Sequence, residues 1–217
     1  MMISLAPLKY RGWRLFTGLK TYQDLCDQQW ILCPGEQVML PSAIYREGEL
    51  EKVTGVQEDT TLNLELQRIQ GGLREIPGSI AYRLRDVQIH HGYVYKKAMK
   101  LTLTVAKESF FASEEAEYFS NAALVSTYCS NRYFAHWMTD YLTLVIAAQP
   151  LAKVLRTAQK TTQHQEEYGY LLNLNSTPVT QAYCKELIWF DDCGQNRLKR
   201  ERYDQIRSKL RTLAPHE

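Results

Sequence analysis

The stretch 131–149, NRYFAHWMTDYLTLVIAAQ, decides how the second half of the chain is expected to fold. An apolar run, AALVSTY at 122–128, precedes it and suits a short buried strand. Ser130 and Asn131 are suitable residues for a helix cap, so we predict a helix over residues 132–149. A strand, a cap and a helix form the start of a βα unit.

A second βα unit is predicted further along the chain. The run YGYLLNLN at 168–175 suits a buried strand, and Thr177 and Pro178 suit the cap and first position of a helix through VTQAYCKELIW at 179–189. The segment between the two units, 152–168, is expected to begin as a helix and end as a polar loop. This alternation implies a parallel sheet with helices on its faces.

The first part of the chain is expected to be rich in β-structure. Pro and Gly recur at turn positions through residues 1–80, which favours short strands joined by loops over long helices. Alternating apolar residues in YRLRDVQIHHGYVY at 82–95 predict a β-hairpin that turns at His91 and Gly92. The segment KLTLTVAKES at 100–109 predicts a further strand.

The end of the chain predicts an amphipathic helix. In the segment NRLKRERYDQIRSKLRTL, at 196–213, apolar residues recur at a helical spacing. They are Tyr203, Ile206, Leu210 and Leu213. The fold class expected for the whole chain is therefore α/β, with a β-rich portion at 1–115 and a Rossmann-like parallel-sheet portion at 116–217 that together form one compact unit.

Composition excludes several classes of protein. The chain has 26 basic and 24 acidic residues among 217, and this near balance argues against a dedicated nucleic-acid binder. The five cysteines never form a CxxC pair, which disfavours a disulfide framework and favours a reducing cytoplasm. No segment approaches the roughly 18 apolar residues that span a bilayer. A cytoplasmic protein is expected, and peripheral attachment to the inner membrane stays open.

The predicted helix at 132–149 carries two polar residues one turn apart, His136 and Asp140. They lie near the N-terminus of the helix, at the carboxyl edge of the preceding strand, where ligands bind in open α/β sheets. The aspartate can fix the histidine tautomer and yield a general base, or either side chain can hydrogen-bond a polyhydroxyl ligand. The same pair also stabilises helices without any further role.

Other charged groups have simpler interpretations. His90 and His91 form a pair at the tip of the predicted hairpin, where side chains usually face solvent, and no Cys or carboxylate stands at a ligand spacing beside them. No metal site is therefore expected. Asp191 and Asp192 follow a predicted helix and are interpreted as a turn.

The segment NRYFAHWMTDYLTLVIAA resembles the N-x-x-x-x-H-W-x-x-D region of glycosyltransferase family 61. Three other stretches resemble the family in the expected order. They are LPSAIYREGELEKVTG, YRLRDVQIHHGYVY and FDDCGQNRLKRERYDQIRSKL. The resemblance covers most of residues 36–213.

The resemblance implies one half of a two-domain enzyme of the GT-B type. The chain would be its acceptor-side half, and the reaction would transfer a sugar from a nucleotide sugar, as co-substrate and without another cofactor, to a glycan hydroxyl in polysaccharide biosynthesis. The catalytic residues implied are His136 and Asp140. The implied substrate-binding residues are Asn131, Tyr133, Trp137 and Arg85.

The sequence also departs from the family pattern. Family members have a second half with an Arg-rich strand region ending in Asn-Glu and a later His-Gly-Ala-Gly motif, and neither motif occurs here. Three explanations stay open: an excised or truncated N-terminal half, a chain that works with a separate donor-domain partner, or a chain that has lost catalysis. An exposed interdomain face would favour a homo-oligomer. The alternative is a non-catalytic glycan-binding or interaction module.

Overall fold

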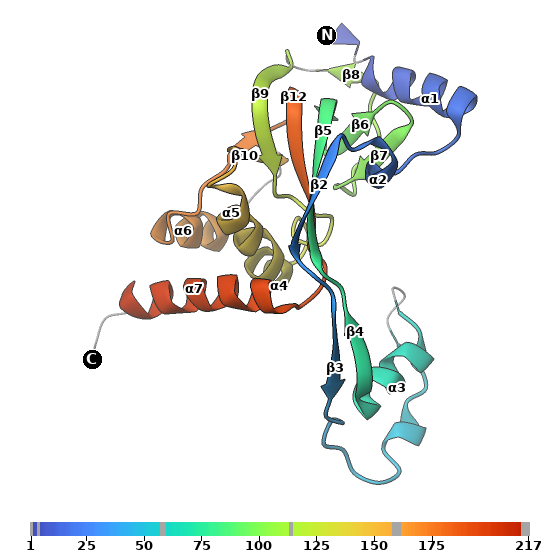
Figure 1. Cartoon of the computed structure of the whole chain (residues 1–217), viewed down its shortest axis with the longest axis vertical. Helices are drawn as coiled ribbons and strands as arrows, with labels where there is room; N and C mark the ends of the chain where they lie inside the picture. Colours follow the sequence, from blue (N-terminus) through green and yellow to red (C-terminus); the bar gives the residue numbers. More distant parts are fainter. Residues whose placement is uncertain (1, 4, 57–59, 113–114, 158–161, 214–217) are drawn as a thin grey trace.

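The computed structural model of the chain describes residues 2–3, 5–56, 60–112, 115–157 and 162–213. Its centre is an eight-stranded sheet in the order β11-β10-β9-β12-β5-β6-β7, with β2 paired to β5 outside this order. The strands are β2 (Gln28–Cys33), β5 (Ser79–His90), β6 (Tyr93–Lys96), β7 (Met99–Thr102), β9 (Glu117–Leu124), β10 (Lys153–Thr157), β11 (Thr177–Val179) and β12 (Gln181–Asp191). A two-stranded arm extends from one end of this body, and helix α1 lies at the other end (Figure 1).

The sheet is parallel on one side, from the β11 edge to β12. Strands β11, β10, β9 and β12 are neighbours and run in one direction. The connection from β9 to β10 is helical, and α6 connects β10 to β11. These helical segments are α4 (Phe134–His136), a π-helical segment (Trp137–Tyr141), α5 (Leu142–Ala148) and α6 (Gln163–Leu171). The α/β fold with parallel strands and the helix predicted at 132–149 are confirmed.

The other part of the sheet is antiparallel. Strand β12 pairs with β5 from Gln181 to Asp191, and β5, β6 and β7 follow one another as hairpins. The predicted hairpin turns at His91 and Gly92, whose φ angles of 47° and 80° match the left-handed pair of a type I′ turn. Strands from 1–115 and from 116–217 thus share one sheet.

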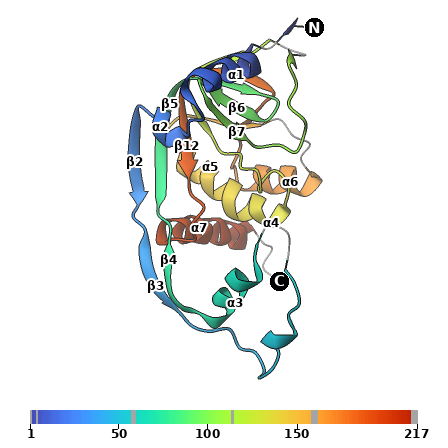
Figure 2. The same cartoon turned by 90° about the vertical axis from the view of Figure 1, so that its right-hand side faces the viewer.

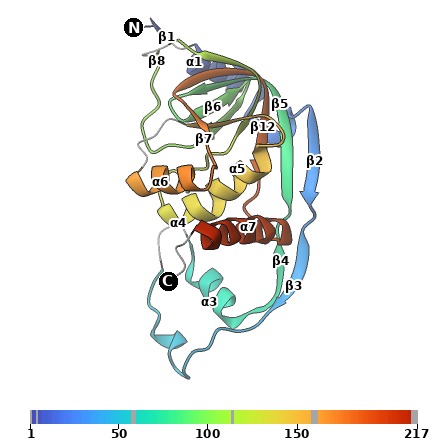
Figure 3. The same ribbon diagram turned by 90° about the vertical axis from the view of Figure 1, so that its left-hand side faces the viewer.

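The sheet curls around a first apolar core. Only Thr180 separates β11, at one edge, from β12, in the middle of the sheet, so the sheet must bend to bring these strands together. All seven strands of the main order contribute buried residues to the enclosed cluster, which includes Leu84, Val94, Met99 and Leu155. Figure 3 shows this curved sheet with the helices on its other side.

The helices cover the outer face of the parallel strands and form a second core. Leu142 and Val145 of α5 pack with Ala123 of β9 and Ile188 of β12 in this cluster. Helix α7 (Arg197–Leu213) adds Ile206 to it. The amphipathic helix predicted at the end of the chain is therefore confirmed, and its packing against α5 holds the π-helical segment between two layers.

Three predicted elements are wrong. The segment predicted as a strand at 168–175 is largely the end of α6, because Thr162 and Gln165 form a capping box that starts a helix ahead of it. The segment predicted as a helix at 179–189 lies in β11 and β12. Its Val, Tyr, Ile and Trp residues favour strands, and pairing on both sides with β9 and β5 fixes that state. The start of 152–168, predicted as a helix, is β10.

The N-terminal part contains a long helix that the sequence interpretation did not include. Helix α1 (Ala6–Thr17) has Pro7 in its first turn and ends at Gly18, whose φ is 72°. Its Tyr10 packs against Tyr95, with ring centroids 5.8 Å apart. The other elements of this region are β1 (Met2–Ile3), α2 (Tyr22–Leu25) and β8 (Phe111–Ala112).

The arm continues two strands of the sheet. After Pro34 and Gly35, β2 leads into β3 (Glu36–Leu40), which pairs with β4 (Gly72–Ile76) ahead of β5. The segment between β3 and β4 includes a short 3₁₀ helix (Leu50–Lys52) and α3 (Leu62–Gln70). Figure 2 shows the arm beyond α7 and away from the sheet. None of the residues of β3, β4 and α3, all of them described, is buried.

Among the described residues, no helix combines the length and the apolar character that crossing a membrane requires.

Candidate functional site

A pocket of about 340 Å³ lies at the carboxyl ends of the parallel strands β9 and β12. We call it the His136 pocket; the residues that define it are Tyr22, His136, Asp140, Trp189 and Asp191. Strand β9 lies between β10 and β12, and the chain continues from β9 to β10, away from β12. This is a switch point in the strand order, where ligands bind in open α/β sheets.

His136 and Asp140 form the pair that the sequence predicts. His136 Nδ1 lies 2.7 Å from Asp140 Oδ2. The histidine side chain is 48% exposed, whereas that of the aspartate is only 17% exposed. Asp140 belongs to the π-helical segment, and such turns occur frequently at functional sites. The imidazole is therefore accessible from the pocket, and the carboxylate supports it from the less exposed side.

A buried lysine supports the aspartate. Lys199 Nζ lies 2.6 Å from Asp140 Oδ1 and donates a second hydrogen bond, of 2.8 Å, to the carbonyl oxygen of Asp192. Its side chain is only 2% exposed. Lys199 is held there because Asn196 caps α7 by accepting a hydrogen bond from the Lys199 backbone N–H at 3.1 Å.

The end of β12 and the start of α7 are held by a second buried ion pair. Arg202 donates two hydrogen bonds of 2.9 Å to the two carboxylate oxygens of Asp192. Ser79 donates to the same carboxylate, and Asn196 donates to Ser79 Oγ at 2.9 Å. Arg202 also donates to the Thr143 carbonyl oxygen of α5 at 3.2 Å. These bonds fix Lys199 relative to the π-helical segment.

This arrangement gives the two side chains different roles. A carboxylate accepts hydrogen bonds, and both Asp140 oxygens already accept, one from Lys199 and one from His136. When Nδ1 of His136 donates to Asp140, its Nε2 carries the free lone pair. His136 is then the residue placed to accept a proton from a hydroxyl group in the pocket, and Asp140 orients it.

The far wall of the His136 pocket is aromatic and acidic. Tyr22 donates a hydrogen bond of 2.9 Å to Asp191 Oδ2. Burial, together with this bond to a carboxylate, raises the pKa of Tyr22 to about 12, so it stays protonated. Burial and the nearby Asp191 charge also raise the pKa of the Cys193 thiol. The wall therefore presents a neutral phenol, a thiol and one carboxylate.

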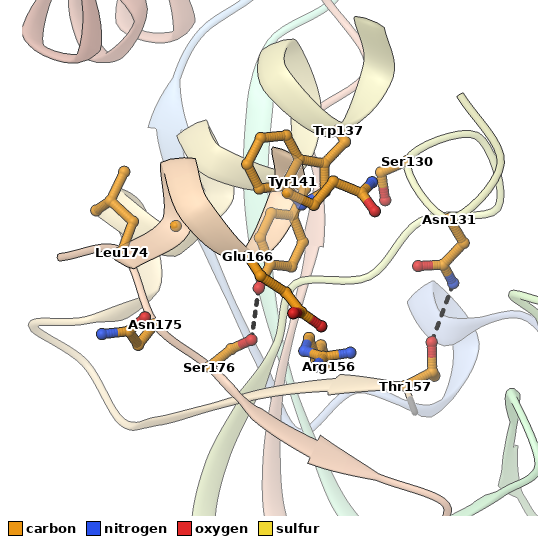
Figure 4. A pocket seen from close by; sticks show the side chains of 12 residues that line it. Ser130, Asn131, Trp137, Tyr141, Arg156, Thr157, Glu166, Leu174, Asn175 and Ser176 are labelled. Atoms are coloured by element: carbon orange, nitrogen blue, oxygen red, sulfur yellow. Dashed lines mark hydrogen bonds between the residues drawn. The ribbon is translucent and has the colours of Figure 1, made fainter. Parts of the chain in front are cut away.

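A second pocket, of about 250 Å³, lies at the carboxyl ends of β9 and β10. We call it the Asn131 pocket; the residues that define it are Asn131, Trp137, Tyr141, Arg156 and Ser176. It lies on the other flank of the π-helical segment. Figure 4 shows Arg156 between Ser176 and Thr157, with the rings of Trp137 and Tyr141 above them.

Hydrogen bonds fix the positions of the polar side chains in the Asn131 pocket. Asn131 Nδ2 donates to the Leu103 carbonyl oxygen at 2.7 Å and to Thr157 Oγ1 at 3.0 Å. The Tyr141 and Ser176 hydroxyls lie 2.5 Å apart, and burial raises the pKa of Tyr141. Asn131 therefore ties the loop after β9 to the end of β10 and to the residue after β7, and its amide oxygen is the group left to face a ligand.

The remaining predicted site residues divide between two places. Tyr133 is exposed next to His136, with ring centroids 6.0 Å apart, and its other neighbour is the Arg132 guanidinium. Arg85 lies on β5, where it faces Glu186 of β12 at 3.6 Å, and it lines neither pocket. Five of the six predicted residues thus gather around the π-helical segment, and Arg85 does not.

Five functional candidates were missed in the sequence, namely Tyr22, Trp189, Asp191, Lys199 and Arg202, and Asp191 ends β12 instead of forming the predicted turn. The apolar stripe of the last helix was predicted as Tyr203, Ile206, Leu210 and Leu213. Of these only Ile206 is buried, and the other buried residues of the helix are Lys199 and Arg202. Their spacing of three and four residues continues the line of Ile206 toward the start of the helix. The sequence signal that could have identified them is a basic residue, Lys199 or Arg202, at a position where the helical spacing predicts an apolar one.

The histidine pair of the hairpin does not face solvent as predicted. His90 is buried, and its Nε2 lies 2.8 Å from the Ser109 carbonyl oxygen. Its ring packs edge-on against that of His91, with centroids 4.5 Å apart. Within the described ranges, no group of three or more His, Cys, Asp or Glu side chains is arranged to hold a metal ion.

Comparisons of the chain with protein-family models, with curated proteins and with solved structures gave no match.

Proposed function

We propose that the chain is the acceptor-side, Rossmann-like half of a GT-B-type glycosyltransferase and that the His136 pocket holds the acceptor hydroxyl. The observation that carries this proposal is the chain of contacts from Lys199 through Asp140 to His136. It leaves one imidazole nitrogen free in a pocket at the switch point of the parallel strands. The family resemblance at 131–148 supplies the class of reaction.

In the proposed reaction, an acceptor hydroxyl donates its proton to His136 Nε2. The hydroxyl oxygen forms a bond to the anomeric carbon of a nucleotide sugar as the bond from that carbon to the phosphate oxygen breaks. The nucleotide leaves with the bonding electrons, and the proton stays on the imidazolium. Asp140 stabilises that cation, and Lys199 keeps Asp140 oriented toward it. A separate donor-domain partner supplies the nucleotide sugar.

The surroundings of His136 suit a sugar. Trp189 and Tyr22 provide ring surface, with centroids 6.1 Å apart, and Asp191 is an acceptor for sugar hydroxyls. In this proposal the Asn131 pocket, with Trp137 and Asn131, holds a neighbouring unit of the glycan. Tyr133 lies at the exposed edge beside His136, and Arg85 has no part.

The proposal is tested by glycan binding and by sugar transfer. Calorimetry with a panel of bacterial oligosaccharides should identify an acceptor, and UDP-, GDP- and CMP-sugars should then be tested for transfer to it. We expect His136→Asn to lower the transfer rate by a factor of about 10²–10⁴, the usual contribution of a general base, with little change in glycan affinity. His164→Asn is the matched control, since His164 is exposed on α6.

Two results would redirect the assignment. Saturable glycan binding that depends on Trp189 or Asp191, without transfer even when donor-domain candidates are added, would favour the alternative of a non-catalytic glycan-binding module. Equal transfer by His136→Asn and the His164→Asn control would remove His136 from the reaction.

A further inference from the structure

Helix α1 lies at the end of the molecule opposite the arm, and all three views agree on this position. Only its Ala6, Pro7 and Tyr10 are buried, where the helix packs on β6 and β7. The helix therefore has one attached face and one face directed away from the rest of the described chain.

The outward face of α1 is apolar. Leu15 is 85% exposed and Phe16 is 88% exposed, and Leu8 is also exposed. Leu8 and Leu15 are seven residues apart, which puts them on one line along the helix, and Phe16 lies next to that line. Leu5 and Leu19, at the two ends of the helix, are exposed as well. Together these five residues form what we call the α1 stripe.

Basic residues flank the α1 stripe. The segment from Leu5 to Lys20 contains no acidic residue. Lys9 and Arg14 are exposed, and neither has an ion-pair partner within the described ranges. Arg11 is different, because it pairs with Glu108 at 3.1 Å. Lys97, from the turn after β6, adds a further positive charge 5.9 Å from the ring of Trp13. The local charge of this end is therefore positive, although the whole chain is nearly neutral.

We propose that α1 lies in the surface of an anionic lipid bilayer, with the α1 stripe among the acyl chains and the basic residues at the headgroups. Helices with an apolar face and a Lys- or Arg-rich flank bind bilayers in this way. Because Leu15 and Phe16 are more than 80% exposed, they can insert into a fluid surface without needing a matching groove. The positive charge of Lys9 and Arg14, which have no ion-pair partner within the described ranges, favours anionic lipid over neutral lipid. This proposal does not depend on the proposed function.

The test uses the full chain and vesicles of phosphatidylcholine, with and without phosphatidylglycerol. We expect co-sedimentation with the anionic vesicles, and this should weaken as salt is raised. The double variant Leu15→Ser/Phe16→Ser should lower the partition coefficient by at least about tenfold, because two exposed apolar side chains no longer insert. Lys9→Glu/Arg14→Glu should lower binding to the anionic vesicles only.

The matched control is Met39→Ser/Ile44→Ser, which removes two exposed apolar side chains from the arm and should leave vesicle binding unchanged. Thermal unfolding shows whether each variant is folded. Trp13 gives a readout without altering the stripe: its fluorescence should shift to shorter wavelength on anionic vesicles, and Trp13→Phe should remove that shift.

Three outcomes would overturn the proposal. One is an absence of binding to either vesicle type, and another is an equal loss of binding in the arm control. The third is a dimer in solution that Leu15→Ser/Phe16→Ser dissociates while vesicles stay unbound, which would assign the stripe to a second copy of the chain.

Discussion

Lys199 Nζ and Asp140 Oδ1 lie 2.6 Å apart although 59 positions separate the two residues in the chain. The contact joins the first turn of α7 to the π-helical segment and brings a buried ammonium to the residue that orients His136. A buried charge is tolerated only when it is paired and hydrogen-bonded. The two residues should therefore depend on each other for stability.

Replacement of Asp140 by Asn should destabilise the fold by about 3–5 kcal/mol, because it leaves the Lys199 charge buried without its counter-ion. Lys199→Met should cost less, since Asp140 is partly accessible to water and keeps its bond to His136. Urea unfolding of the two single variants and the double variant measures this. The double variant should be more stable than Asp140→Asn alone, and strictly additive costs would contradict the pairing.

The bidentate pair of Arg202 and Asp192 gives a second stability prediction. Arg202→Met should cost about 3–5 kcal/mol, because Asp192 is almost fully buried and loses two hydrogen bonds. Arg202→Lys should also destabilise, since one ammonium cannot bind Asp192 and also replace the bonds that Nη1 and Nε of Arg202 donate to the Thr143 and Leu198 carbonyl oxygens. The matched control on the same helix is Arg207→Ala, whose pair with Asp204 is exposed; its cost should be within about 0.5 kcal/mol.

A loss from Arg202→Met no larger than that from Arg207→Ala, measured by guanidinium unfolding, would show that the buried pair does not hold α7 against β12.

The fold was predictable where a short segment contains its own signal. The hairpin has a turn signal at His91 and Gly92 and the helix at 132–149 has a periodicity signal, and both elements were predicted correctly. The cap predicted from Ser130 and Asn131 is wrong, because Tyr133 is the N-cap and no side chain caps the helix. The segment 179–189 has no such local signal. Its apolar residues suit a helix as well as a strand, so the strands that pair with it decide its secondary structure. Pairing of β12 with both β9 and β5 is a long-range effect that periodicity does not report.

The candidate site likewise has contacts that the sequence predicts and contacts that it does not. His136 and Asp140 are one turn apart, so helical spacing alone predicts their contact. Lys199 reaches Asp140 only because α7 packs across α5, and no local pattern contains that information. Arg85 was attributed to the site through resemblance, and its position on β5 is set by sheet register rather than by the motif.

The reactivity of the Cys193 thiol depends on the charge of Asp191 in the His136 pocket. Burial first, and then the neighbouring carboxylate, raise its pKa, so the reactive thiolate is scarce at pH 8. Cys129 and Cys193 are both exposed, yet we expect Cys193 to react with iodoacetamide more slowly than Cys129, and Asp191→Asn to accelerate Cys193 severalfold. Peptide mass spectrometry gives both rates in one sample. Buried Cys184, whose pKa burial raises to about 12, should stay unlabelled and shows that the chain is folded.

A Cys193 rate that Asp191→Asn leaves unchanged relative to Cys129 would mean that this carboxylate does not act on the thiol.

His90 predicts a loss of stability in mild acid. Burial is the main cause that lowers its pKa below the ordinary value of 6.5, and the positive charge of His91 acts in the same direction. The unfolded chain therefore binds a proton at a pH where the folded chain does not, so stability is complete above about pH 6.5 and falls as the pH drops toward the folded pKa. The slope should reach at most about 1.4 kcal/mol per pH unit.

The measurement is the free energy of unfolding in urea between pH 7.5 and pH 5. His90→Gln removes the titration while its amide can still donate to the Ser109 carbonyl oxygen, so its slope should be smaller than that of the unaltered chain. His164→Gln, at an exposed position, should keep the original slope. Because the carboxylates whose pKa is lowered titrate below this window, a slope that is the same in all three proteins would mean that His90 is protonated equally in the folded and unfolded states.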